Sequence, residues 1–295
     1  MCWTNARGLG GDAHNGPDLL TWHRALLLEF EHALNAVSDR PVAIPYWDWT
    51  NPASTRAMLR ADFMGTTGRA KDGYVVTNGP FRKGQWRIRV KGPTVTNPAQ
   101  SDWIVRAVGG SSLAPTPPTT TDVRRALARP AYDVAPFGVL SDARQSFVAY
   151  LGGATKPTGI TCTKGVRDVQ GATGVRLHAQ AHAYIGGSDA EGNPGTLTDT
   201  VASPNDPVFW LLHANVDRLA EAWWAAHDHE YLPRADGPQG ANAGDTLWPF
   251  SVTNADMARP AETLGYTYVA PATSTATVAL AQSPAWICRL TAVAA

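Results

Sequence analysis

Five histidines stand at spacings that could bring their imidazole rings around a metal ion. His14 and His23 lie nine residues apart near the start of the chain, and His178, His182 and His213 lie in its second half. Neutral imidazole is the most common metal ligand in proteins and suits zinc, copper, iron and nickel. The chemistry that these residues could support is therefore that of a metal centre held by histidine.

The pair His178 and His182 has the most specific spacing. In "LHAQAHAYIGG" the two residues are four positions apart, so on a helix they project from one face about one turn apart. Ala179 occupies the place of the general-base Glu in the HExxH motif, which excludes that class of metalloprotease. No carboxylate has the spacing expected for an iron site of two histidines and one carboxylate, so spacing alone leaves zinc and copper open.

The alternative for any one of these residues is a core histidine whose nitrogens are hydrogen-bonded within the protein. The group as a whole argues against it, because four of the five fall on the apolar faces of predicted helices and His14 stands at the mouth of the first. Leaving buried imidazoles without partners costs about 1–3 kcal/mol for each unsatisfied group, and a metal ion removes that cost. The other histidines are assigned no role: His32 lies on a polar helix flank, and His227 and His229 lie near a helix end.

Three helices must position the five residues. The first is predicted at residues 19–37, where apolar residues recur at helical spacing after Asp18, a suitable N-cap. The second is predicted at residues 174–185. The third is predicted at residues 207–226, with Pro207 at its first position. Three residues before it could provide the cap: Ser203, Asn205 and Asp206.

The remaining chain offers few further elements. A helix is predicted at residues 142–151, whereas residues 54–130 are rich in Gly, Pro and Thr and are expected to hold at most short strands such as "QWRIRV". The tail after Val269 is expected to form a strand or an extension, and no linker divides the chain. Four tryptophans are expected to pack as core and not to bind substrate: Trp22, Trp47, Trp49 and Trp210.

Composition restricts the classes of partner. The 25 basic and 25 acidic residues cancel, which removes the electrostatic reason to expect a nucleic acid or an anionic membrane as partner. No apolar run approaches the roughly 18 residues that a membrane-spanning helix requires. The opening "MCWTNARGLGG" lacks the basic and apolar regions of a secretion signal, and localisation stays open between secreted and cytoplasmic. The three cysteines include no CxxC pair and are too few for a disulfide framework.

The motifs together resemble those of a known family. "HNGPDLLTWHRALLLEFEHAL" followed by "IPYWDW" resembles the copper-A signature of bacterial tyrosinases and related polyphenol oxidases, and "LHAQAHAYIGG" and "SPNDPVFWLLHANVDRLAEAW" resemble their copper-B signature. The resemblance covers about residues 8–270. It implies a mainly α fold in which a four-helix bundle, with long loops and a few short strands, holds two copper ions. It also implies oxidation of small phenols, o-diphenols above all, to o-quinones with molecular oxygen as co-substrate.

The resemblance implies two copper-A ligands and three copper-B ligands: His14 and His23, and His178, His182 and His213. The first copper-A ligand of the family has no counterpart, because no histidine precedes His14. We expect that the chain starts late and that copper A is poorly occupied in it. Residues 1–270 would then be the copper-binding domain without that ligand, and residues 271–295 a tail of unassigned role.

Several departures from the family pattern bear on the substrate. Ala179 stands where many bacterial tyrosinases have an Asn that helps to orient a water for deprotonating monophenols. Leu212 replaces a frequent His, and Thr21 replaces a frequent Pro. The resemblance therefore favours o-diphenols or o-aminophenols over monophenols. Hydrogen bonds that fix the ligand rings are expected from three residues that could otherwise be caps or surface charges: Asp206, Asn205 and Asp217.

Two alternatives stay open at this point. One is an oxygen-binding or catalytically impaired member of the same scaffold. The other is a mononuclear metal protein, such as a zinc protein, that uses only His178, His182 and His213. The sequence also leaves open whether a separate copper-delivery protein is a partner.

Overall fold

The computed structural model describes residues 13–14, 16–89, 101–138, 141–153 and 176–269, together with the backbone of residues 288–290. Helices supply most of the regular structure in this part of the chain, which confirms the mainly α class. The α-helices are α1 (Leu19–Val37), α2 (Pro52–Met58), α3 (Thr120–Leu127), α4 (Phe147–Gly152), α5 (Leu177–Gly186), α6 (Val208–Ala225) and α7 (Asn254–Met257). The shorter elements are the 3-10 turns η2 (Ala70–Asp72), η5 (Ser203–Asn205) and η6 (Ala261–Leu264), and the strands β1 (Tyr266–Tyr268) and β2 (Cys288–Leu290).

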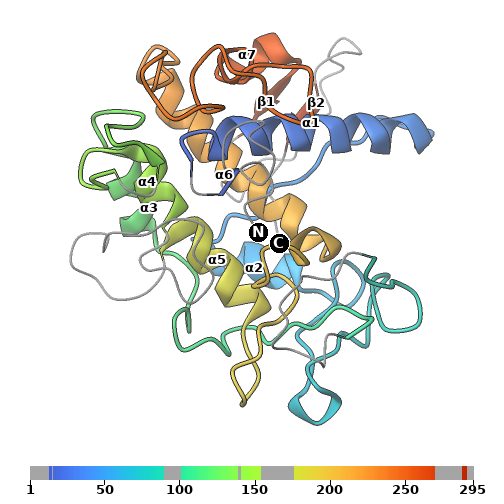
Figure 1. The fold of residues 1–295 in the computed structure, drawn as a ribbon. Helices are drawn as coiled ribbons and strands as arrows, with labels where there is room; N and C mark the ends of the chain where they lie inside the picture. The colour runs from blue at the N-terminus through green and yellow to red at the C-terminus, as the bar shows by residue number, and fades with distance from the viewer. Residues whose placement is uncertain are drawn as a thin grey trace.

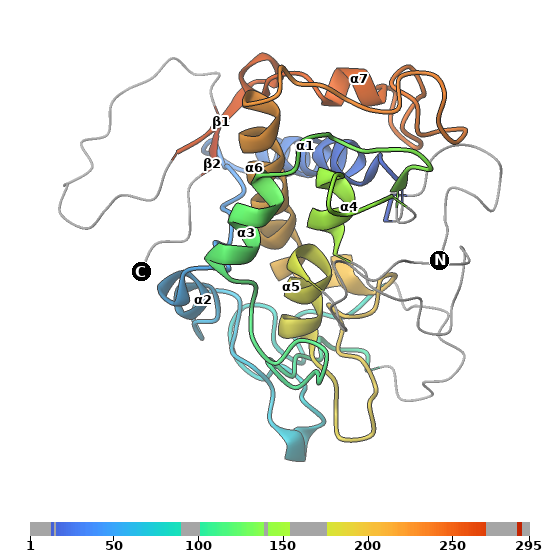
Figure 2. The same cartoon turned by 90° about the vertical axis from the view of Figure 1, so that its left-hand side faces the viewer.

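The two longest helices, α1 and α6, cross and pack against each other (Figures 1 and 2). The predicted bounds of α1 are confirmed, and Leu19, Leu20 and Leu27 of its apolar stripe are buried. Asp18 precedes the helix, but its side chain accepts no capping hydrogen bond. The apolar stripe, and not the cap, therefore fixes α1 in place.

Helices α4 and α5 complete the frame of the site. Helix α5 packs against α6 and α4, and α4 also contacts α1. Helix α4 begins only at Phe147, because Ser146 caps it by accepting a hydrogen bond from the Ala149 N–H. Residues 143–145 form a turn where a helix was predicted. The four helices meet around one core, and the regular four-helix bundle stays a prediction.

Two expectations for the middle of the chain are wrong. Residues 54–130 were expected to hold at most short strands, yet they include most of α2 and all of α3. Both helices are set by local caps: Asn51 accepts from the Ala53 N–H, and Thr119 forms a reciprocal capping box with Asp122. In the described part of "QWRIRV", residues 85–89, the pairing is an isolated bridge between Arg87 and Trp103.

The core is aromatic, as the sequence predicts. Trp47 and Trp49 are fully buried, whereas Trp22 and Trp210 are partly buried at the edges of core clusters. Strands β1 and β2 pair in parallel, with Tyr266 opposite Cys288, so one part of the C-terminal tail forms a strand.

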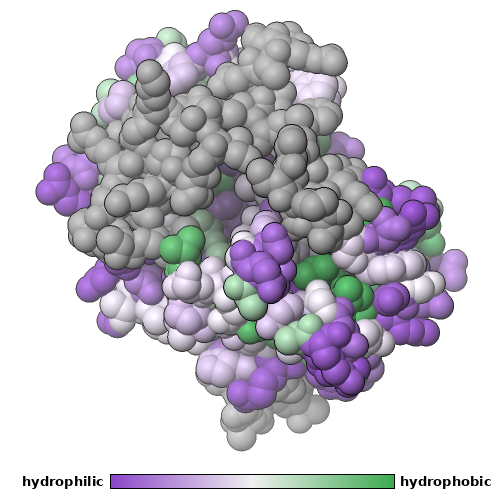
Figure 3. Space-filling view, turned by 60° about the horizontal axis from the view of Figure 1, so that its bottom comes forward, coloured by the Kyte–Doolittle hydropathy of each residue, from purple (hydrophilic) through white to green (hydrophobic). Residues whose placement is uncertain are grey.

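The surface of the described chain is mixed. The large hydrophobic residues exposed there are Val37, Trp86, Leu113 and Val269. Figure 3 shows small hydrophobic patches interrupted by hydrophilic ones on one face. Among the described helices, none is both long enough and apolar enough to cross a membrane.

Candidate metal centre

The five histidines come together at the junction of α1, α5 and α6. Helix α1 supplies His23, α5 supplies His178 and His182, α6 supplies His213, and His14 lies just before α1. The closest rings are those of His23 and His213, which stack in parallel with their centroids 3.9 Å apart. The centroid of His178 lies 5.0 Å from that of His213, and His14 meets His23 edge-on at 5.5 Å. Residues up to 199 positions apart in the sequence thus form one cluster.

Three of the rings form a tighter group. His178, His182 and His213 each offer a nitrogen, and these three atoms lie within 4.8 Å of one another. The Nε2 atoms of His182 and His213 approach to 3.1 Å. The helical spacing of His178 and His182 produces this geometry, because it places their rings 4.6 Å apart on the face of α5 that α6 covers.

Backbone carbonyls fix which nitrogen carries the proton in three of the five rings. The Nδ1 of His23 lies 2.8 Å from the Leu19 carbonyl, and the Nδ1 of His182 lies 2.9 Å from the Leu197 carbonyl. A carbonyl oxygen only accepts, so both Nδ1 atoms must carry hydrogen and both Nε2 atoms present a lone pair. The Gly152 carbonyl likewise hydrogen-bonds the ring of His178. Rings held in this way are oriented for metal binding through Nε2.

Three buried nitrogens of the cluster lack hydrogen-bond partners within the described chain. They are the Nε2 atoms of His23 and His178 and the Nδ1 of His213. Each buried unsatisfied group costs about 1–3 kcal/mol. Neutral imidazole nitrogens that converge without donors are a donor set suited to copper or zinc, so the residues present fit the expected metal.

Burial also keeps these rings uncharged. Desolvation is the largest cause, and it lowers the pKa of His182 to about 4, although the hydrogen bond to Leu197 opposes it. Burial lowers the pKa of His23, His178 and His213 well below the ordinary value, and mutual repulsion among the histidines lowers it further. The rings therefore stay available as neutral ligands at and well below neutral pH.

The site is walled by Phe209, one turn before His213 on α6. Its ring centroid lies 4.3 Å from that of His213 and 6.1 Å from those of His23 and His182. On the other side, Trp22 meets His23 edge-on at 5.0 Å. These aromatic contacts limit movement of the histidine rings.

The three residues expected to hold the ligand rings act differently. Asp206 pairs with Arg106, and Asp217 pairs with Arg24 and also accepts from two tyrosine hydroxyls. Within the described chain, neither carboxylate hydrogen-bonds a histidine. The side chain of Asn205 contacts backbone groups. Asp206 does accept from the Val208 N–H and so supports the start of α6, whereas Pro207 precedes the helix instead of opening it.

The groups that do hold the rings were missed from the sequence. They are three carbonyls and the Ser203 hydroxyl, which lies 3.2 Å from the Nδ1 of His182. Carbonyls leave no signal in a sequence, because every residue has one. Ser203 was predicted only as a possible cap of the third helix.

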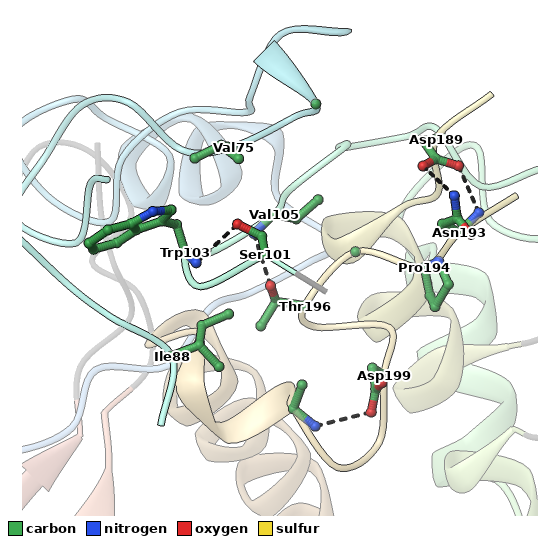
Figure 4. Close-up of a pocket in the computed structure, with 13 residues that line it drawn as sticks. Val75, Ile88, Ser101, Trp103, Val105, Asp189, Asn193, Pro194, Thr196 and Asp199 are labelled. Atoms are coloured by element: carbon green, nitrogen blue, oxygen red, sulfur yellow. Dashed lines mark hydrogen bonds between the residues drawn. The ribbon is translucent and has the colours of Figure 1, made fainter. Parts of the chain in front are cut away.

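The remaining histidines lie outside the cluster. His32 is exposed on α1, as predicted. His227 stacks on Trp223, and the Nδ1 of His229 bonds the Ala258 carbonyl. A cavity of about 370 Å³ is also separate, since none of the five histidines lines it (Figure 4). It lies against the residues that flank Leu197, among them Thr196 and Asp199.

Comparison with known proteins gives matches in sequence and in fold. The family model described as the common central domain of tyrosinase matches residues 1–226. The chain is 38% identical to a tyrosinase of Streptomyces antibioticus over 248 residues, which cover 81% of this chain and 75% of that one. It is 36% identical to a tyrosinase of Streptomyces lincolnensis over 258 residues, covering 86% and 78%.

Among solved structures, the fold resembles that of a tyrosinase from Burkholderia thailandensis at low pH, with a TM-score of 0.53 and 18% identity. The match covers 90% of this chain and 62% of that one, so the present chain spans less than two thirds of the solved protein.

Proposed function

Because the chain belongs to the tyrosinase family, we propose that it is a copper oxidase that converts o-diphenols to o-quinones with molecular oxygen. The family implies a centre of two copper ions. The observation that carries the proposal is the cluster of five imidazoles, four of them held neutral by burial, with unpartnered nitrogens at its centre. Such a cluster has no structural purpose that apolar side chains would not serve better.

The residues divide into two ligand groups. His178, His182 and His213 would hold one copper ion, and His14 and His23 would contribute to the second. Copper bound by these residues would supply the redox chemistry by which electrons pass from the phenol to oxygen. Two molecules of diphenol and one of oxygen then yield two quinones and two waters.

The protein around the site holds the histidine rings in place and keeps them uncharged. Backbone carbonyls hold the protons of His23 and His182 on Nδ1, so the Nε2 of each of these two rings keeps its lone pair. Helices α1, α5 and α6 carry the rings, and Phe209 packs against the ring of His213. A site preorganised in this way loses little free energy to rearrangement during each turnover.

The side chains near the ligands favour diphenols over monophenols. Ala179 follows His178 on α5, and its methyl group cannot hydrogen-bond a water that would deprotonate a monophenol. Leu212 is fully buried in the core, and the Thr21 hydroxyl is engaged with Asn254. A diphenol needs only to lose two electrons and two protons, so it depends less on such a water.

Metal analysis and turnover together test the proposal. Copper-loaded protein should oxidise catechol, followed by quinone absorbance, faster than it oxidises tyrosine. His182→Ala should abolish turnover, whereas His32→Ala, at an exposed position on the same framework, should not change it. Absence of quinone from fully loaded protein would reject the oxidase reading and leave an oxygen-binding or impaired protein.

A mononuclear metal protein is the second candidate. The observation that favours it is the close group of His178, His182 and His213, which is the one set of three such ligands found within the described chain. It predicts one zinc ion per chain after growth without added copper and no catechol turnover after copper loading.

A further inference from the structure

We propose that Arg106 is a positioning residue for His182: the segment around Arg106 braces the loop that holds the His182 ring at the metal centre. The inference rests on the proposed function only in taking His178, His182 and His213 as metal ligands. Arg106 itself touches neither a histidine ring nor the metal position, and it acts through other residues.

The ring of His182 is held from one loop. Its Nδ1 lies 2.9 Å from the Leu197 carbonyl and 3.2 Å from the Ser203 hydroxyl. Both groups belong to the segment that connects α5 to α6. This segment contains no α-helix or strand. The position of the ring therefore depends on what fixes this connection.

Residues 105–107 fix it at three points. The backbone of Val105 exchanges two hydrogen bonds of 2.9 Å with Thr196, the residue before Leu197; the one to the Thr196 hydroxyl is drawn in Figure 4. The Ala107 N–H donates to the Gly186 carbonyl at the end of α5. The side chain of Arg106 reaches Asp206, three residues after Ser203.

The backbones approach too closely here to allow a side chain. Gly187 has a φ of +65°, and a Cβ at that position would lie 1.8 Å from the Ala107 carbonyl oxygen. The brace and the end of α5 therefore form one tight unit. Movement of residues 105–107 must move the support of His182 as well.

The ion pair of Arg106 and Asp206 is wholly buried. Arg106 donates from Nε and Nη2 to the two carboxylate oxygens, at 3.0 and 2.7 Å, and from Nη1 to the carbonyls of Met64 and Gly65. Asp206 in turn accepts from the Val208 N–H, at the start of the helix that carries His213. A lysine cannot reproduce this forked contact, because its ammonium is a single point of charge.

Residues 105–107, together with Asp206, therefore contact both helices of the three-histidine group. The Ala107 contact holds the end of α5, and the Asp206 contact holds the start of α6. Ser203 lies between these points, where the Asp206 N–H donates to its carbonyl at 3.1 Å. Loss of the fork should let the Ser203 hydroxyl and the Leu197 carbonyl drift from the His182 ring.

The test uses the full chain and cobalt(II) as probe, because its visible absorption reports ligand geometry without turnover. Arg106→Met should weaken cobalt(II) affinity by about 10–100-fold, the usual cost of losing a residue that orients a metal ligand, and should alter the absorption spectrum. Arg106→Lys should fall between Arg106→Met and the unchanged chain. Ser203→Ala should weaken affinity in the same direction.

Asp133→Asn is the matched control. Asp133 is buried and hydrogen-bonded to Ser141, Gly138 and Val134, in a loop that does not hold a site histidine. The Asp133→Asn variant should have a lower thermal stability, and its cobalt(II) affinity and absorption spectrum should equal those of the unchanged chain.

Three results would overturn the proposal. The first is that Arg106→Met folds and shows the same cobalt(II) affinity and absorption spectrum as the unchanged chain. If that variant does not fold, normal cobalt(II) binding by both Arg106→Lys and Ser203→Ala overturns it instead. An unchanged chain that binds no cobalt(II) overturns it together with the metal site. Cobalt(II) binding without catechol oxidation by the copper form would reject the proposed function alone.

Discussion

The histidine cluster and a second buried polar cluster share helices α1 and α6, and their polar atoms are satisfied in opposite ways. The second, here called the Arg24 network, consists of Arg24, Asp217, Glu221, Tyr266 and Tyr268. Arg24 follows His23 on α1, and Asp217 lies one turn after His213 on α6. Neighbouring positions on each helix thus serve both clusters.

The Arg24 network is complete within the protein. Arg24 pairs with Asp217 at 2.6 Å and with Glu221 at 2.7 Å, and its Nη1 donates to two backbone carbonyls. The hydroxyls of Tyr266 and Tyr268 donate to the other oxygen of Asp217. Burial alone would lower the pKa of Arg24, but Asp217, Tyr266 and Glu221 outweigh it and raise that pKa, so Arg24 stays charged.

In the histidine cluster, burial keeps four of the rings uncharged, and three of their nitrogens have no partner within the described chain. The difference shows how to separate a structural cluster from a ligand site in one core. A cluster that satisfies its own atoms stabilises the fold, whereas one that leaves lone pairs converging awaits a ligand. Four predictions follow this distinction, in order of decreasing effect.

Breaking the Arg24 network should have the largest effect. Arg24→Met leaves the Asp217 carboxylate buried without its cation, so the free energy of unfolding should fall by about 3–5 kcal/mol. Urea denaturation of metal-free protein measures it. Arg144→Met, which removes an exposed ion pair with Asp142, should leave the value unchanged. A loss below about 1 kcal/mol in Arg24→Met would mean that the network is not structural.

Acid should destabilise the metal-free protein through the histidine cluster. The folded-state pKa of His182 is about 4, below the ordinary value of 6.5, so between these pH values the unfolded chain binds a proton that the folded chain does not. Stability is therefore fully present above pH 6.5 and is lost as the pH falls toward 4. The loss from this residue is on the order of 3 kcal/mol. Urea denaturation across this pH range measures it.

The variant His182→Leu isolates this contribution from that of the carboxylates. It should show a shallower fall in stability over the same pH range, by the share that His182 contributes. Equal pH dependence of the two chains would contradict the assignment of a depressed pKa to His182.

Metal should stabilise through the histidine cluster alone. Zinc at 100 times its dissociation constant should raise the free energy of unfolding by about 2.7 kcal/mol, because it binds the folded chain. Arg24→Met should gain as much, since its network takes no part in binding. His213→Ala should gain much less. Thermal denaturation with and without zinc gives these values, and an equal gain in all three chains would show that zinc binds elsewhere.

The sequence is sufficient to predict what depends on periodicity. The bounds of α1 and the burial of His23, His178 and His213 follow from apolar residues recurring at helical spacing. The short helices α2 and α3 lack such a stripe over enough turns, and their caps are the stronger signal. That these histidines bind copper remains a prediction, drawn from the family resemblance and supported by their convergence.

Long-range pairing could not be predicted. Arg106 and Asp206 lie 100 positions apart, and nothing in the local pattern of either segment connects them. A single charged residue in the apolar run "IVRAV" indicates a buried cation that needs a partner, but it does not name the partner. The carbonyls of Leu197 and Gly152 are still harder to predict, because their identity depends only on how the loops close.

The smallest predicted effect has the opposite sign, and it comes from the residue next to Arg24. His23→Leu removes a buried Nε2 that has no partner and replaces the ring with an apolar side chain of similar size. The Leu19 carbonyl, which loses the His23 ring, still accepts the backbone N–H four residues on in α1. Metal-free His23→Leu should therefore be about 1 kcal/mol more stable than the unchanged chain in urea denaturation. It should keep zinc binding at the other three histidines and lose catechol turnover. If His23→Leu destabilises the metal-free protein as Arg24→Met does, then the histidines are structural too and the two clusters do not differ in kind.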